Sequence, residues 1–209
     1  MMAYWAFTAY GVTLLQEGAS TAGMVADSSD YATFFHKESH DFMDFAVRVP
    51  VVLIGNLDYS DPEVQGEVER ITSLIEGSNP NIADDLYTDS WLRAFLQFLE
   101  RDGADKDFNV HGIKNFTHVL QKEYLASDPT NVFSRDISYD DDGNIQASRF
   151  VFQVQNLKTI DDFRFIMMSF RHLFSTELKD YNITSYHPLY RLGEQASIIG
   201  FLLFSFWQS

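Results

Sequence analysis

The chain has 209 residues and a formal net charge of -15 at pH 7, and 45% of its residues are hydrophobic. One domain with a sizeable core is expected, and the acidic balance excludes nucleic acid as a partner, because phosphate binding needs a basic surface. The absence of cysteine excludes disulfides, thiolate metal sites and a cysteine nucleophile.

The first predicted elements are a short helix and a strand. Residues 30–45 mix aromatic and charged side chains and are predicted to form the helix. Apolar residues then alternate from Phe45 to Leu53, which is the period of a strand. Pro50 lies within this run, and because proline has no N–H, we expect an edge strand or a bulge there.

A second helix is predicted to begin at Pro62, since Asp61 is a good N-cap and proline fits the first helical position. Gly77 is typical of a helix end. The residues between them recur at helical spacing and predict one buried stripe: Val64, Val68, Ile71, Leu74 and Ile75.

A helical segment is predicted to follow. We expect a short strand over 82–87 and then two helices, over 90–101 and 108–125. Each helix carries apolar and aromatic residues on one face. These aromatic side chains are expected to be core residues, although those left outside the core would supply apolar walls for a ligand.

A hairpin and a final helix and strand complete the order. The Asp-Gly pair at 142–143 is typical of a tight turn and predicts pairing of 137–139 with 145–155. Thr159 is expected to cap the last helix, and a strand is expected over 183–190. The apolar stripe of the helix consists of Phe163, Ile166, Met167, Phe170, Leu173 and Phe174.

This order predicts an α+β fold of the ferredoxin-like, split βαβ type. The sheet is expected to be antiparallel, with helices on one face and a helical insertion before the hairpin. No internal repeat or linker is visible, so a single domain is expected.

Chemical motifs are scarce. No GxGxxG, Walker A, HExxH or GxSxG motif occurs, so we expect neither an enzyme nor a cofactor. His36 and His40 would share a helix face near Asp41, but no third metal ligand is placed, and a solvated helix face is the favoured interpretation. The acidic run 140–144 lacks the ligand spacing of a calcium loop and is better explained as a hairpin turn.

Two sequons are candidate N-glycosylation sites, at Asn115 and at Asn182. Both matter only if the domain faces the lumen or the outside of the cell. The apolar run from Ala196 to Trp207 is shorter than the roughly 20 residues that a membrane span needs. It is interpreted either as part of a longer span or as a buried C-terminal helix.

Several short segments resemble, in order and spacing, those of the Patched-related family, near Patched and the Niemann-Pick type C sterol transporter within the RND superfamily. The resemblance runs from about Tyr10 to the end of the chain. The segments are Tyr10-Gly11, Leu14-Leu15-Gln16-Glu17-Gly18, Asp27-Ser28-Ser29-Asp30-Tyr31, Asp58-Tyr59-Ser60-Asp61-Pro62, Asp89-Ser90-Trp91-Leu92, Ala147-Ser148-Arg149-Phe150 and Tyr186-His187-Pro188-Leu189-Tyr190 to Glu194-Gln195.

The resemblance implies the second extracellular or lumenal domain of a polytopic membrane protein, in the plasma membrane or an endomembrane. Residues 12–195 would form that domain, between the end of one transmembrane helix at 1–11 and the start of the next at 196–209. The family transports or senses sterols and other lipids, and some members act in Hedgehog signalling. The implied partners are a sister extracellular domain, a sterol or other lipid, and a secreted protein ligand. The lack of cysteine departs from relatives whose domains carry disulfides.

Two other functions remain open. One is a soluble acidic enzyme or ligand-binding protein whose last helix is buried. The other is a protein-interaction domain that recognises a basic partner through its acidic surface, and that binding would be sensitive to salt.

Overall fold

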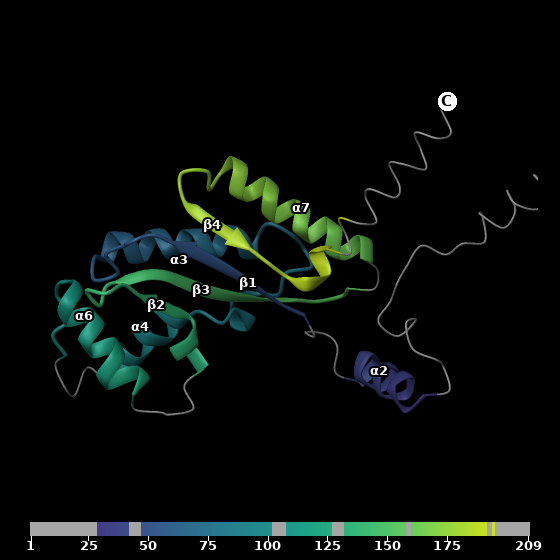
Figure 1. Cartoon of the computed structure of the whole chain (residues 1–209), viewed down its shortest axis with the longest axis horizontal. Coiled ribbons are helices and arrows are strands. Elements are labelled where there is room, and N and C mark those ends of the chain that lie inside the picture. The colour runs from purple at the N-terminus through teal and green to yellow at the C-terminus, as the bar shows by residue number, and fades with distance from the viewer. Residues whose placement is uncertain are drawn as a thin grey trace, which may run out of the picture.

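The chain folds into an α+β structure, described in a computed structural model for residues 29–41, 47–101, 108–126, 132–157, 160–191 and 194 (Figure 1). The helices are α2 (Asp30–Asp41), α3 (Pro62–Glu76), α4 (Trp91–Arg101), α6 (Ile113–Val119) and α7 (Ile160–Thr176). A π-helical stretch (Leu120–Leu125) continues α6, and two 3-10 turns lie at Asp85–Tyr87 and Val132–Arg135. The strands are β1 (Val47–Ile54), β2 (Ile137–Tyr139), β3 (Ile145–Val154) and β4 (Asn182–Ser185).

The four strands form one antiparallel sheet in the order β2-β3-β1-β4. Strand β3 lies between β1 and β2, while α3 and α7 connect β1 to β2 and β3 to β4. This is the split βαβ arrangement of ferredoxin-like folds. The segment between α3 and β2 holds α4 and α6, so the expected fold class and helical insertion are confirmed.

One face of the sheet is buried under the helices. Along β1, Val49, Val51 and Leu53 are at most 2% exposed, whereas the alternate residues are more accessible. Residues from α3, α4, α6 and α7 join these three valine and leucine side chains in a single hydrophobic cluster. Among the described elements, the helices therefore cover one face of the sheet, as the order of elements predicted.

Aromatic side chains fix the helical insertion to this core. The rings of Tyr59 and Trp91 lie 5.1 Å apart, and Phe95 packs edge-on against Phe116 at the same centroid distance. The Tyr59 hydroxyl lies 2.7 Å from the Ser148 hydroxyl, and burial raises the pKa of Tyr59 to about 12. These aromatic residues are core residues and do not form walls of an apolar path.

Pro50 is not on an edge strand, because β1 lies between β3 and β4. Its antiparallel partner Val151 exchanges two backbone hydrogen bonds with Asp89, on the other side of β3. Pro50 and Val151 thus form a non-hydrogen-bonded pair, in which the missing N–H of proline costs no bond to β3. Pairing with β4 starts only at Val51, so Pro50 loses no bond on that side either.

The predicted strand over 82–87 is wrong. Ile82 and Asp89 instead form isolated bridges to Val154 and Val151 of β3, and the chain between them makes a 3-10 turn. The short β2 pairs only with the first part of β3, and this segment pairs with the part of β3 that follows it.

Several element bounds also differ from the expectation. The expected helix over 108–125 begins only at Ile113 and changes to π-helical geometry at Leu120. The last strand ends at Ser185, not at Tyr190. Helix α2 agrees with the expected helix over Asp30–Asp41, and the rest of that expected helix, 42–45, lies outside the described residues. The hairpin loop is longer than a tight turn, because Tyr139 pairs with Ile145.

The described helices include none that is long and apolar enough to cross a bilayer. Residues 1–11 and 196–209, for which transmembrane helix ends were expected, lie outside the described residues, as does the expected helix cap Thr159.

Two phenylalanines of α7 provide a test of this packing. Phe170 is fully buried and Phe165 is 59% exposed. We expect Phe170→Ala to lower the free energy of unfolding by about 3–5 kcal/mol, because it leaves a cavity in the core. Phe165→Ala, the matched control, should change it by less than about 0.5 kcal/mol. Urea unfolding followed by circular dichroism measures both, and equal losses would contradict the one-sided core.

Candidate binding site

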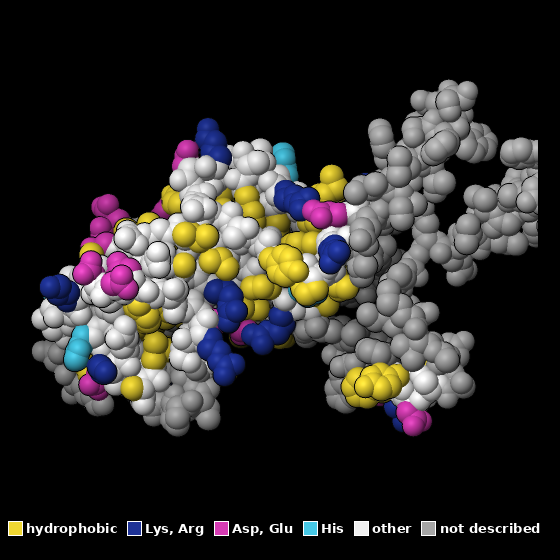
Figure 2. Space-filling view, viewed as in Figure 1, with side chains coloured by type: hydrophobic (Ala, Val, Ile, Leu, Met, Phe, Trp, Pro, Cys, Tyr) yellow, Lys and Arg dark blue, Asp and Glu magenta, His cyan; other side chains and the backbone are white. Residues whose placement is uncertain are grey.

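The face of the sheet opposite the helices is the main candidate for a binding surface. On this face β1 presents Arg48, Pro50, Val52 and Ile54, and β3 presents the residues in register with them: Ala147, Arg149, Val151 and Gln153. Figure 2 shows Lys and Arg side chains gathered near the middle of the sheet, with apolar patches beside them. No helix of the described ranges covers this mixed surface, and a surface of this kind suits contact with a partner.

The site lies where the outer edge of β3 changes partner. The Arg149 N–H donates to the Asp136 carbonyl at 2.7 Å, at the start of β2. Two residues further on, Val151 exchanges hydrogen bonds of 2.8 and 3.1 Å with Asp89. Two segments that are distant in the sequence are therefore held side by side, and each places an aspartate next to the open face.

A hollow of about 270 Å³ lies at this junction. Half of the lining residues are charged and half are apolar. The charged groups could orient a ligand, and the apolar ones give it a hydrophobic contact surface. The lining residues are Arg48, Pro50, Asp89, Val132, Phe133, Asp136, Arg149 and Val151.

The charged groups form two ion pairs of different exposure. Arg149 donates from Nε to Oδ1 of Asp136 at 2.6 Å, and the Asp136 side chain is only 7% exposed. Arg48 pairs with Asp89, and the two side chains are 59% and 36% exposed. Because the more buried carboxylate holds the more accessible guanidinium in each pair, the arginines are the groups presented to solvent.

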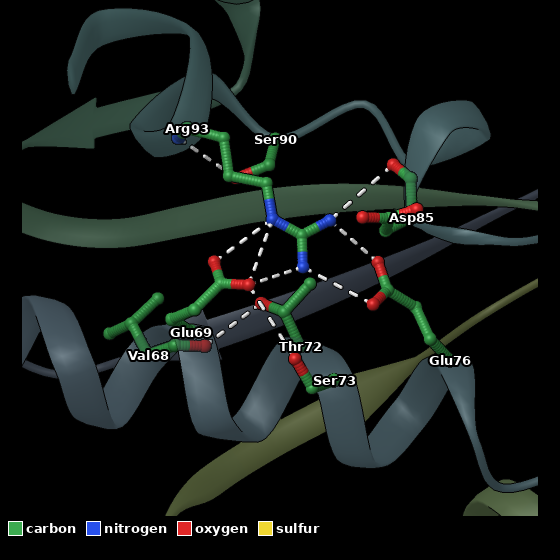
Figure 3. A network of polar contacts seen from close by, with 8 residues as sticks. All are labelled: Val68, Glu69, Thr72, Ser73, Glu76, Asp85, Ser90 and Arg93. Carbon is green, nitrogen blue, oxygen red and sulfur yellow. Dashed lines mark hydrogen bonds and ion pairs between the residues drawn. The ribbon is translucent and has the colours of Figure 1, made fainter. Parts of the chain in front are cut away.

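A cluster around Arg93 holds the segment that carries Asp89 (Figure 3). The Arg93 guanidinium, on α4, donates to Glu69 at 2.6 Å and to Glu76 at 2.7 Å, both on α3. It also reaches the Asp85 carbonyl at 3.5 Å, and hydrogen bonds to Glu69 and then Glu76 raise the pKa of Arg93. Since its side chain is only 20% exposed, Arg93 fixes the insertion to the sheet-covering helix.

The two sequon asparagines lie in different surroundings. Asn115 is exposed on α6 and donates from Nδ2 to the His111 carbonyl at 2.9 Å, but the Thr117 of its sequon is only 6% exposed. Asn182 opens β4, and both it and Thr184 are exposed. Of the two, Asn182 offers the more accessible sequon.

The structure places the other candidate residues apart from the hollow. His36 and His40 belong to α2, and no cluster of three or more metal-binding side chains exists in the described part of the chain. Asp140 accepts hydrogen bonds from the N–H groups of Asp142 and Asn144, which lowers the pKa of Asp140, with Asn144 the larger cause. The acidic run therefore closes the hairpin loop, as interpreted from the sequence.

Sequence reasoning did not single out the four charged residues of the hollow. Arg48 and Arg149 stand at the polar positions of alternating strands, which was the one available signal. Asp89 and Asp136 lie just outside regular elements, and only long-range pairing with β3 brings them together. No family model matches the chain.

The Arg93 cluster generates a prediction about the site. We expect Arg93→Met to lower the free energy of unfolding by about 1.5–3 kcal/mol, because Glu76 is left without its charged donor. The Val151 amide, bonded to Asp89, should lose protection in hydrogen exchange as the segment loosens.

The matched control is Arg171→Met. Arg171 pairs with Glu194 at the surface, where the two side chains are 60% and 46% exposed. Loss of this pair should lower the free energy of unfolding by less than about 1 kcal/mol. Unchanged protection of Val151 in Arg93→Met would show that the cluster does not position Asp89.

Proposed function

We propose that the chain is an extracellular or lumenal domain of a Patched-related membrane protein that takes part in sterol or lipid transport or sensing. The resemblance of segments along the chain motivates the proposal. The ferredoxin-like strand order with a helical insertion is compatible with it. Because fold alone does not establish function, the proposal rests on the surface of this domain.

The observation that carries the proposal is the one-sided burial of the sheet. Helices cover one face, while the other face exposes Arg48, Ile54 and the mixed hollow. A sheet face that the described residues leave uncovered, with apolar and paired charged groups, is typical of a domain that packs against another. In the intact protein, the sister extracellular domain would occupy this face.

The position of the aromatic residues bears on where a lipid would pass. Trp91, Phe95, Phe116, Phe152 and Phe170 are all at most 1% exposed and fill the core. A lipid path would therefore run between this domain and its neighbour instead of through its interior. Movement of the two domains against each other would then open or close the path.

A second candidate function is a soluble acidic domain that binds a ligand or a protein. The hollow favours it, because exposed arginines beside apolar side chains can hold a ligand without a membrane. The two functions differ in the expected mass, glycosylation and membrane association of the native protein.

The test is a denaturing blot of the native protein, with and without a glycosidase that removes N-linked glycans. We expect a membrane-fraction band far heavier than the 24.0 kDa of this chain, which shifts downward after treatment. In matched variants, Asn182→Gln should remove more of that shift than Asn115→Gln, because the Asn182 sequon is the more accessible one. An untreated band near 24.0 kDa in the soluble fraction, unchanged by the enzyme, would sink the proposal.

A further inference from the structure

The hollow on the open face presents hydrogen-bond donors that its own ion pairs do not use. Arg149 directs Nε and Nη2 to one oxygen of Asp136, and Arg48 directs Nη2 to Asp89. A guanidinium carries five N–H donors in one plane, so both arginines keep donors for a further acceptor. An apolar wall stands beside them, in which Val132 is 68% exposed.

We propose that this hollow binds a carboxylate of a partner protein, presented by an Asp or Glu side chain next to an apolar residue. The planar donors of arginine match the two oxygens of a carboxylate better than those of any other cationic side chain. The neighbouring apolar residue of the partner would pack on Val132, Phe133 and Pro50, which line the same hollow. The two contacts together explain why charged and apolar groups share the site.

The size of the hollow indicates a side chain and not a free ligand. Its volume of about 270 Å³ lies below the usual range for small-molecule pockets. It also lies on the sheet face that the described helices leave open, so its occupant would stay attached to a larger body packed over the surrounding strands. A projecting side chain that enters a small pocket is the usual form of an interface anchor.

Local charge does not oppose this assignment. The charged residues that line the hollow are Arg48, Arg149, Asp89 and Asp136, so two positive charges balance two negative ones. The whole chain carries -15, which repels acidic proteins at a distance. A carboxylate accepted here is thus recognised by these arginines at contact and not by long-range attraction.

This inference rests on the proposal that the bare face packs against a partner, but not on that partner being a sister domain. The test is a titration of the ¹⁵N-labelled 209-residue chain, followed by two-dimensional NMR. The probe is the capped tripeptide Leu-Glu-Leu, and its uncharged match is Leu-Gln-Leu. Isovalerate, a free carboxylate with an apolar body, tests the small-molecule source.

We expect saturable shifts of the Val151, Asp89 and Phe133 amides with the Glu peptide, and binding at least about fivefold weaker with the Gln peptide. Arg48→Gln should weaken binding of the Glu peptide by a similar factor. Because the ion pair of Arg48 with Asp89 is exposed, this substitution should leave the fold intact. Arg149→Lys, which keeps the charge and the pairing to Asp136, should also weaken binding, since the planar fork is lost.

The matched control is Arg70→Gln. Arg70 lies on α3, on the helical side of the sheet, where it pairs with Glu67 and is 48% exposed. An equal loss in Arg48→Gln and Arg70→Gln would overturn the site, because only net charge would then matter. Equal affinity of isovalerate and the Glu peptide would overturn the partner assignment, and no saturable shift with either probe would overturn the proposal. None of these outcomes bears on the glycosidase result, so the two proposals fail separately.

Discussion

The pairing of β1 with β3 is the constraint on which the rest of the structure depends. It extends over eight residue pairs, from Val47 with Val154 to Ile54 with Ala147. Because side chains alternate between the faces of a sheet, this register sends Val49 and Val51 to the helices and Arg48 to the open face. A shift of one residue would exchange the two faces and bury arginine among the helices. The register therefore determines the core and the candidate site together.

The same register explains how β3 binds a third segment. Val151 lies opposite Pro50, and in an antiparallel pair of this kind its backbone groups point away from β1. Those groups are the ones that bond to Asp89. The same non-hydrogen-bonded pairing therefore tolerates proline at position 50 of β1 and leaves the Val151 backbone free to bond to Asp89. The Arg93 cluster then secures the Asp89 segment, so that the edge does not depend on two backbone bonds alone.

Helix caps and apolar stripes predicted the helices and strands of the ferredoxin-like fold well, because each of these signals depends only on residues close together in the sequence. Asp61 caps α3 through a 2.9 Å bond from the Glu63 N–H, and the stripe of α7 is buried as its spacing indicated. The site was not predicted, because Asp89 and Asp136 are placed by β3, which is more than 50 residues from Asp89. The failed strand over 82–87 has the same cause. Its bridges to β3 depend on tertiary pairing, and no alternation in its own sequence encodes them.

Frame and insertion contribute different halves of the candidate site. The ferredoxin-like frame supplies both arginines, from β1 and β3, while Asp89 and the Val132–Arg135 turn come from the segment between α3 and β2. The two strands thus provide the arginines with Pro50 and Val151, and the insertion provides the two aspartates with Val132 and Phe133. Since a buried carboxylate such as Asp136 holds its guanidinium in one orientation, the insertion determines which way the donors of Arg149 point. Substitutions confined to the Val132–Arg135 turn, which has no buried residue, would therefore change the lining of the hollow without removing a buried core side chain.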